Sequence, residues 1–248
     1  MAAVFSELIN PESLSVCVSV DLRKTLYIVD RFAVTVTWHP IEEVKQNTMA
    51  INLQKGQRIS LTKEAPGLRR LMCGLGWDVA GSQYWGLGRV FGNGADFDLD
   101  ASVFCLNDRG RVSRPEDVVY YGNLRHSSGA IVHGGDNLTG QGDGDDEQIF
   151  IDLPQIPQDI VRLAITVNIY DCRARRQDFQ QVKNAFVRLV DRATQKELAR
   201  YNLSGENYHG MTGMMMAQIY RSPQGWQLEA VGKGLHVNGL DAIARSFG

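Results

Sequence analysis

The stretch MAINLQKGQRISLTKE, residues 49–64, sets the pattern from which the fold of this chain is predicted. Its apolar residues alternate with polar ones, which is typical of strands that turn one face toward a core. The alternating apolar residues are Ile51, Leu53, Ile59 and Leu61. We therefore expect the main domain to begin at Met49.

Similar short segments follow to the C-terminus, separated by Gly, Asn and Asp. No long segment with a helical period lies between them, which disfavours βαβ units. The sequence therefore predicts a mainly all-β protein, an antiparallel β-sandwich of two sheets with short peripheral helices. The expected strands are 50–54, 57–62, 71–77, 97–106, 118–122, 147–153, 162–170, 184–191, 197–202, 214–221 and 226–231. The expected helices are 178–185 and 239–248.

Composition limits the functions that the chain can serve. Its 248 residues carry 26 basic and 28 acidic side chains, a formal net charge of −2. Binding to nucleic acid through bulk charge is thereby excluded, because neutralising phosphates requires surplus Lys and Arg. Hydrophobic residues make up 44% and charged residues 22%, as in an ordinary globular protein with a buried core.

The cysteines and the N-terminus indicate where the chain works. The four cysteines are scattered and form no C-x-x-C pair, which excludes a zinc ribbon and a dense disulfide scaffold. The first residues lack the positive region of a secretory signal, and no apolar run approaches the roughly 20 residues of a membrane span. We therefore expect a reduced, cytoplasmic setting.

Residues 1–48 differ from the remainder. They contain two strand-like runs, 16–22 and 26–38. Two interpretations stay open for them: a genuine N-terminal extension, or an upstream stretch translated only because an earlier start codon was chosen. Residues 49–248 form the predicted single domain.

Carboxylates concentrate in two places. Asp96, Asp98 and Asp100 occupy alternate positions of a predicted strand, so that all three lie on one face. The second place, residues 133–150, holds five carboxylates and no Lys or Arg, with glycines between them. Its carboxylates are Asp136, Asp143, Asp145, Asp146 and Glu147. Such a loop repels itself unless a positive charge neutralises it.

A calcium ion satisfies this electrostatic demand. Calcium takes six to eight oxygen ligands at about 2.3–2.6 Å in irregular geometry, and glycines let backbone carbonyls approach it. The loop is no EF-hand, because the twelfth position counted from Asp143 is Pro154. Solvated Gly-Asp turns are the plain alternative. The second carboxylate row favours metal binding over that alternative.

Other candidate sites carry weaker signals. His126 and His133 lack partners with metal-ligand spacing, and Ser127 and Ser128 lie in no G-x-S-x-G elbow. The arginines within 172–177 are most simply a solvated basic turn, with an anion site as the alternative. Met214, Met215 and Met216 are expected in the core.

Taken together, these motifs resemble the TerD family of tellurium-resistance and stress proteins. The resemblance runs through 49–248 in order. It is carried by NLQKGQRISLTKEAPGL (52–68), GLGWD (74–78), DFDLDASVFCLND (96–108), VYYGNL (119–124), SGAIVHGGDNLTGQGDGDDEQIFIDL (128–153) and the closing AVGKG and GLDAIARSFG segments of 226–248. The resemblance implies a β-sandwich that binds Ca²⁺ through acidic loops.

The family's metal-binding positions carry over residue by residue. Asp98 and Asp100 match the D-L-D strand, and Asp136 and Asn137 match the G-D-N segment. The G-D-G-D-D-E segment is matched by Asp143, Asp145, Asp146 and Glu147. Asp78 matches the Asp of G-W-D, and Asp96 falls outside the D-L-D core.

The resemblance implies a calcium-binding stress-response protein, a binding or assembly module and not an enzyme. Its expected partners are other tellurium-resistance and stress-operon proteins, with peripheral association at the inner membrane face as a further expectation. Relatives are linked to cyclic nucleotides, so a small molecule or nucleotide stays open as a ligand, although no P-loop is present. The alternative function is a metal-dependent phosphohydrolase or nucleotide-binding protein, with an open metal position beside Arg69, Arg70 or the 173–176 arginines.

Overall fold

The structure, a computed structural model, describes residues 50–79, 98–135, 145–203 and 208–247, together with three short strands nearer the N-terminus. The chain divides into two compact units, residues 1–48 and 49–248. In the first unit, β1 (Val16–Val20), β2 (Thr25–Val29) and β3 (His39–Pro40) form an antiparallel sheet in the order β1-β2-β3.

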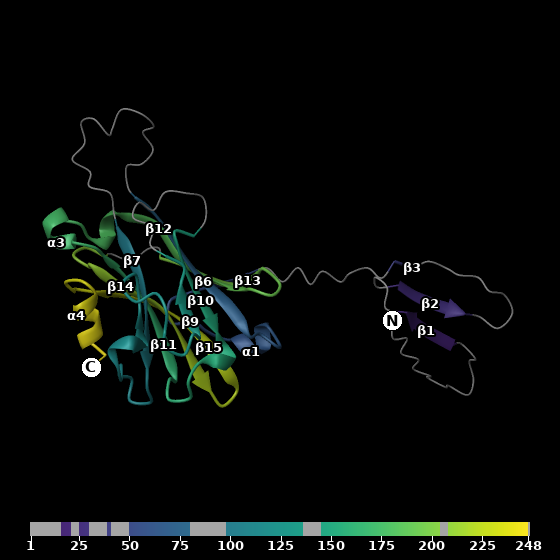
Figure 1. The fold of residues 1–248 in the computed structure, drawn as a ribbon. Coiled ribbons are helices and arrows are strands. Elements are labelled where there is room, and N and C mark those ends of the chain that lie inside the picture. The colour runs from purple at the N-terminus through teal and green to yellow at the C-terminus, as the bar shows by residue number, and fades with distance from the viewer. Residues whose placement is uncertain are drawn as a thin grey trace. The chain divides into compact units, whose positions relative to one another are not determined.

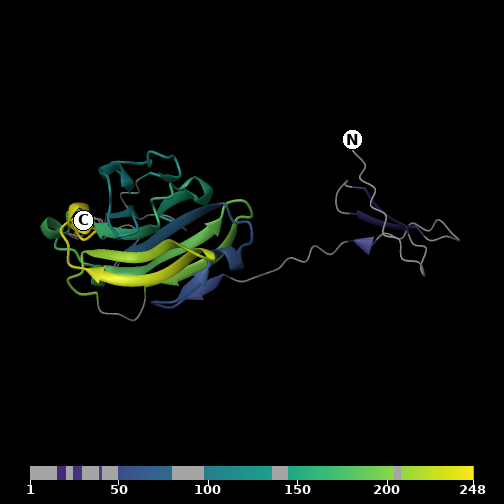
Figure 2. The same cartoon turned by 90° about the horizontal axis from the view of Figure 1, so that it is seen from below.

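The second unit contains two six-stranded sheets that lie face to face (Figure 1, Figure 2). The strand order of the first sheet is β4-β13-β12-β6-β10-β9. Its strands are β4 (Ile51–Leu53), β6 (Arg70–Val79), β9 (Ile131–His133), β10 (Glu147–Asp152), β12 (Val182–Asp191) and β13 (Lys196–Asn202). All its pairs are antiparallel except β4 with β13, which is parallel.

The strand order of the second sheet is β5-β15-β14-β11-β7-β8. Its strands are β5 (Arg58–Ser60), β7 (Leu99–Leu106), β8 (Val118–Val119), β11 (Arg162–Ile169), β14 (Gly213–Ser222) and β15 (Gly225–Leu235). All pairs in it are antiparallel. The predicted two-sheet sandwich is therefore confirmed, with the one parallel pair as a difference.

The main core lies between the sheets. Leu71, Cys73 and Leu75 of β6 point into it at alternate positions, and Leu163 and Ile165 of β11 face them from the other sheet. Burial of this apolar surface is the main force that holds the two sheets together. The predicted core positions of Met214 and Met216 are confirmed, because both side chains are buried there.

A second, smaller core covers the outer face of the second sheet. Helix α4 (Leu240–Arg245) buries Ile243 against Phe104 and Ala164, and the rings of Phe104 and Phe247 lie 5.1 Å apart. Figure 1 shows this helix, in yellow, beside β14 and β7. Strands β7 and β11 are consequently buried on both faces, which explains why apolar residues in them do not simply alternate with polar ones.

Three local expectations differ from the structure. The predicted helix 178–185 is only the 3₁₀ turn η3 (Phe179–Gln181), because Asp178 caps it and the left-handed backbone of Asn184 continues into a bulged β12. The predicted strand 57–62 ends at Ser60, which caps helix α1 (Leu61–Glu64). The arginine turn is helix α3 (Cys172–Arg175).

Two further short elements follow strands β7 and β10 along the chain. The 3₁₀ turn η1 (Pro115–Asp117) lies between β7 and β8, and the 3₁₀ turn η2 (Leu153–Gln155) follows β10. Among the residues described, no helix is long and apolar enough to cross a membrane.

Candidate metal site

Two predicted ligands lie where β7 begins, and the end of β11 positions them. Asp98 and Asp100 are 8% and 4% exposed, on the same face as the alternation predicts. The backbone N–H of Tyr170 donates to the Asp98 carbonyl at 2.8 Å. Asn168, which pairs with Asp100 in register, donates its amide N–H to Asp100 Oδ2 at 3.1 Å. Asp96 lies outside the described residues.

Asn168 is a polar residue that sequence reasoning missed. Its side chain is 3% exposed, and its Oδ1 has no hydrogen-bond partner among the described residues. Buried amide oxygens are ordinarily hydrogen-bonded. An amide oxygen without such a bond, beside two carboxylates, is suited to coordinate a cation. The signal in the sequence is the Asn near the end of the mainly apolar strand β11.

Glu147 reaches this region from the other sheet. It opens β10, is 2% exposed, and its Oε2 accepts the backbone N–H of Ala101 on β7 at 2.6 Å. His133 of β9 contacts the same residue, because its Nε2 donates to the Ala101 carbonyl at 3.3 Å and lies 3.6 Å from Glu147 Oε2. The His133 Nδ1 accepts the N–H of Gly135 at 3.2 Å. The Nε2 bond of His133 therefore joins the two sheets, and its Nδ1 bond holds the ring against the chain that follows β9.

Asp146 is fixed to the end of β6. Its backbone N–H donates to the Leu75 carbonyl, and its Oδ2 accepts the N–H of Trp77, both at 2.8 Å. The first bond continues the β6–β10 ladder beyond Glu147, which pairs with Leu75 in register, and the second attaches the Asp146 side chain to β6. The acidic loop therefore enters β10 along a defined path.

Asp145 is held by an arginine. The Nε and Nη2 atoms of Arg188 donate to its two carboxylate oxygens at 2.7 and 3.0 Å, and the Asp145 side chain is fully buried. Arg188 also donates to Glu197 at 3.0 Å. The hydrogen bond from Arg188 to Asp145 raises the pKa of the guanidinium above its usual range, against an opposing effect of partial burial.

The side chains of four predicted ligands lie outside the described residues. Asp136, Asn137 and Asp143 lie outside the described residues, as does the side chain of Asp78, whose backbone pairs with Lys183 in β12. Within the ranges that the structure describes, no group of three His, Cys, Asp or Glu side chains is placed to hold a metal ion. The described part of the site thus supplies oxygen donors from β7, β10 and β11.

The arginine turn borders the same end of the second sheet. Arg173 and Arg176 are exposed, as expected for a solvated basic turn. Arg175 lies over the exposed Tyr170 ring at 5.4 Å from its centroid, and its Nη1 is 3.8 Å from Asp98 Oδ2. A positive side chain therefore stands beside one of the buried carboxylates.

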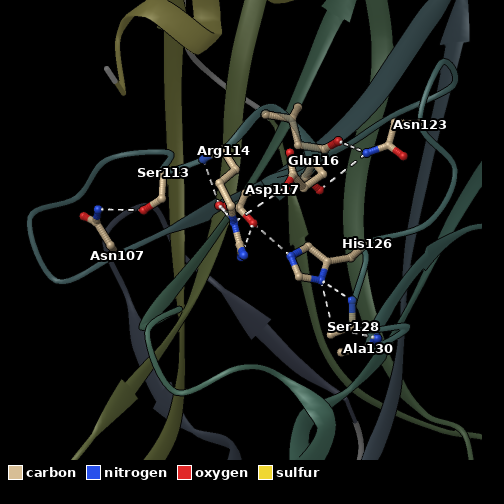
Figure 3. A network of polar contacts seen from close by, with 10 residues as sticks. Asn107, Ser113, Arg114, Glu116, Asp117, Asn123, His126, Ser128 and Ala130 are labelled. Carbon is tan, nitrogen blue, oxygen red and sulfur yellow. Dashed lines mark hydrogen bonds and ion pairs between the residues drawn. The ribbon is translucent and has the colours of Figure 1, made fainter.

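A Ser-His-Asp chain of contacts lies elsewhere, between Asp117 of η1 and the hairpin after β8 (Figure 3). The Nδ1 of His126 is 2.8 Å from Ser128 Oγ, and its Nε2 is 3.2 Å from Asp117 Oδ1. The N–H groups that follow the serine are already bonded: Gly129 donates to the His126 carbonyl and Ala130 to Ser128 Oγ. An oxyanion hole needs such donors free, so this arrangement serves to hold the hairpin.

Comparison with known proteins decides the family. The family model described as TerD domain matches residues 49–247. The chain belongs to the TerD family. A stress response protein of Bacillus subtilis (strain 168) is 47% identical over 200 residues, covering 80% of this chain and 100% of the relative. The tellurium resistance protein TerD of Serratia marcescens is 40% identical over 200 residues, covering 81% of this chain and 98% of the relative.

Solved structures carry the same TerD fold. A homologue of telluride resistance protein from Streptomyces coelicolor A3(2) matches with a TM-score of 0.52 at 22% identity, covering 69% of this chain and 93% of that chain. A protein of unknown function matches with a TM-score of 0.56 at 21% identity, covering 72% of this chain and 95% of that chain. The chain is thus a TerD-family protein, of the family to which tellurium-resistance and general stress proteins belong.

Proposed function

We propose that this TerD-family protein binds calcium where β7, β10 and β11 meet, and acts as a calcium-dependent binding or assembly module in a stress response. The observation that carries the proposal is the buried set of oxygen atoms on Asp98, Asp100 and Asn168. A hard divalent cation accepts carboxylate and amide oxygens alike, so such a set is the kind that calcium prefers.

The donor set fits calcium in kind. Asp98, Asp100 and Asn168 would hold the ion from the second sheet, and Glu147 would contribute from the first. The family resemblance assigns further ligands to Asp78, Asp136, Asn137, Asp143 and Asp146. A bound calcium ion would supply two positive charges to an otherwise acidic edge. Because its ligands come from both sheets, it would couple the loops of the two layers.

The direct test is thermal unfolding of the full chain in excess EGTA, in calcium and in magnesium. A ligand at a hundred times its dissociation constant adds about 2.7 kcal/mol to the folded state. We expect a calcium-specific rise in Tm that disappears in Asp100→Asn. The matched control is Asp159→Asn. Asp159 is exposed and precedes the start of β11, whereas Asn168 lies near the end of that strand. If neither calcium nor magnesium changes the Tm of the wild type, the proposal is contradicted.

One observation favours the competing function of a metal-dependent phosphohydrolase, namely the position of Arg175 near Asp98. An arginine beside a metal stabilises charge that develops on a transferred phosphoryl group. Hydrolysis of p-nitrophenyl phosphate with calcium or magnesium separates the two functions. Turnover that is lost in both Arg175→Gln and Asp100→Asn supports the hydrolase, and calcium binding without turnover supports the binding module.

A further inference from the structure

We infer that Asp145 is a positioning residue and not a calcium ligand: its ion pair with Arg188 fixes the path along which the acidic loop delivers Asp146 and Glu147 to the metal site. This inference rests on the proposed calcium function. It departs from the ligand role that the family resemblance assigns to Asp145.

The geometry of Asp145 leaves its carboxylate fully engaged. Each oxygen accepts one guanidinium N–H of Arg188, and Oδ2 also accepts the side-chain amide of Gln148 at 3.3 Å. Paired, bidentate bonds of this kind combine charge with directional specificity. A carboxylate that is fully buried under such a pair would have to give up both bonds before it could turn toward a metal ion.

The sheet is shaped to receive this carboxylate. Gly74 of β6 pairs with Arg188 on one side and with Gln148 on the other. A Cβ atom on Gly74 would overlap the Asp145 carboxylate carbon and oxygens. The carboxylate thus occupies the space that a side chain would fill, and only glycine permits so close an approach.

Asp145 and its two successors form a single rigid entry into β10. The Asp145 carboxylate is held by Arg188, Asp146 is bonded to Leu75 and Trp77, and Glu147 reaches Ala101 across the sandwich. Groups that orient metal ligands without touching the metal typically change affinity by about 10- to 100-fold when they are removed. We expect the Asp145–Arg188 pair to act in this way.

The two roles predict opposite effects of removing the arginine. If Asp145 were a ligand, Arg188→Gln would free a carboxylate from a competing cation and calcium would bind more tightly. If Asp145 positions the loop, Arg188→Gln weakens calcium binding by roughly tenfold or more, and Asp145→Asn does the same. Because the two residues act through one contact, the double variant should be no weaker than either single variant.

The experiment is a calorimetric calcium titration of the full chain and of Asp145→Asn, Arg188→Gln, Arg188→Lys and the double variant. Arg188→Lys keeps the charge but loses the bidentate contact, so we expect an intermediate affinity. Arg200→Gln is the control, because Arg200 bonds to Glu197 on the same face of the sheet without a described contact to Asp145. Circular dichroism at the titration temperature establishes that each variant is folded.

Tighter calcium binding in Arg188→Gln, or additive losses in the double variant, would overturn the inference. A wild type that binds no calcium overturns the proposed function, which the same titration reports separately. Unfolding in EGTA then still tests the ion pair, since Asp145→Asn and Arg188→Gln should each lower Tm, and the double variant should lower it by less than the sum of the two losses. Asp146→Asn shows how a ligand should behave by comparison. The loss of calcium affinity that it causes should be as large in the Arg188→Gln background as in the wild type.

Discussion

The carboxylate of Glu147 on β10 accepts the backbone N–H of Ala101 on β7 at 2.6 Å, which joins the two sheets of the sandwich at the edge where the acidic segments meet. The Ala101 carbonyl is bonded in turn by His133 of β9. Side chains of one sheet thus satisfy the backbone of the other. A bound metal ion would add to a connection that the protein already makes.

Removing this connection should destabilise the fold without any metal. In Glu147→Ala the buried N–H of Ala101 loses a charge-assisted bond, and a loss of about 2–3 kcal/mol in the free energy of unfolding is expected. Urea denaturation in EGTA measures it. Glu116→Ala serves as a control, since that side chain is half exposed, and its change should stay within about 0.5 kcal/mol. Equal stability of the two variants would contradict this role of Glu147.

The C-terminal helix should stabilise the second sheet by covering its outer face. Ile243→Ala removes a fully buried side chain from the cluster around Phe104, and a loss of about 2–5 kcal/mol is expected. Chemical denaturation provides the measurement. The exposed Asp241 of the same helix gives the comparison, because Asp241→Ala leaves the cluster intact. A loss below about 1 kcal/mol for Ile243→Ala would mean that the helix packs only loosely.

The cysteines of the sandwich should resist alkylation. Burial raises the pKa of the Cys73 and Cys105 thiols well above the usual range, because the thiolate is disfavoured away from water. Raising the pH to about 8.5, near the ordinary thiol pKa, should therefore produce no reactive thiolate at either position. Peptide mapping after iodoacetamide treatment tests this, with urea-unfolded protein as the positive control. Rapid labelling of Cys73 in the folded protein would disagree with its buried position.

Glu197 should make stability depend on acid. Partial burial raises its pKa, but hydrogen bonds from Arg200 and Arg188 outweigh this effect and leave the pKa below its usual value. Its stabilising effect is therefore complete above the ordinary glutamate pKa of about 4.3 and is lost as the pH falls through the lower, folded value. Tm measured from pH 6 to pH 3 should fall more steeply in wild type than in Glu197→Gln. Parallel curves for the two proteins would rule out this contribution.

Local patterns predicted the sandwich because the residues of a long strand reflect how many of its faces are buried. Apolar and polar residues alternate where one face is buried, and most residues are apolar where both are. They failed where a short contact decided the outcome. The 178–185 segment has helical composition, yet the Asp178 cap and the left-handed Asn184 direct it into η3 and β12. Strand β9 is only three residues long, and its place is fixed by pairing with β10. Neither feature has a local periodicity to reveal it.

The acidic segments were visible in the sequence, but the partners of their side chains were not. Asp145 is bonded by Arg188, 43 residues further along the chain, and Asp100 by Asn168, 68 residues away. Such partners depend on which strands become neighbours. A row of carboxylates can therefore be recognised from sequence, whereas its division into ligands and positioning residues requires the fold.

The most direct test of the central claim is a calorimetric titration of the full chain with calcium, repeated with magnesium and with Asp100→Asn. The account predicts saturable calcium binding in wild type, much weaker binding of magnesium, and loss of the calcium signal in Asp100→Asn while the protein stays folded. Absence of heat change in wild type, together with an unchanged Tm in calcium, would contradict it and leave the acidic edge as part of the fold alone.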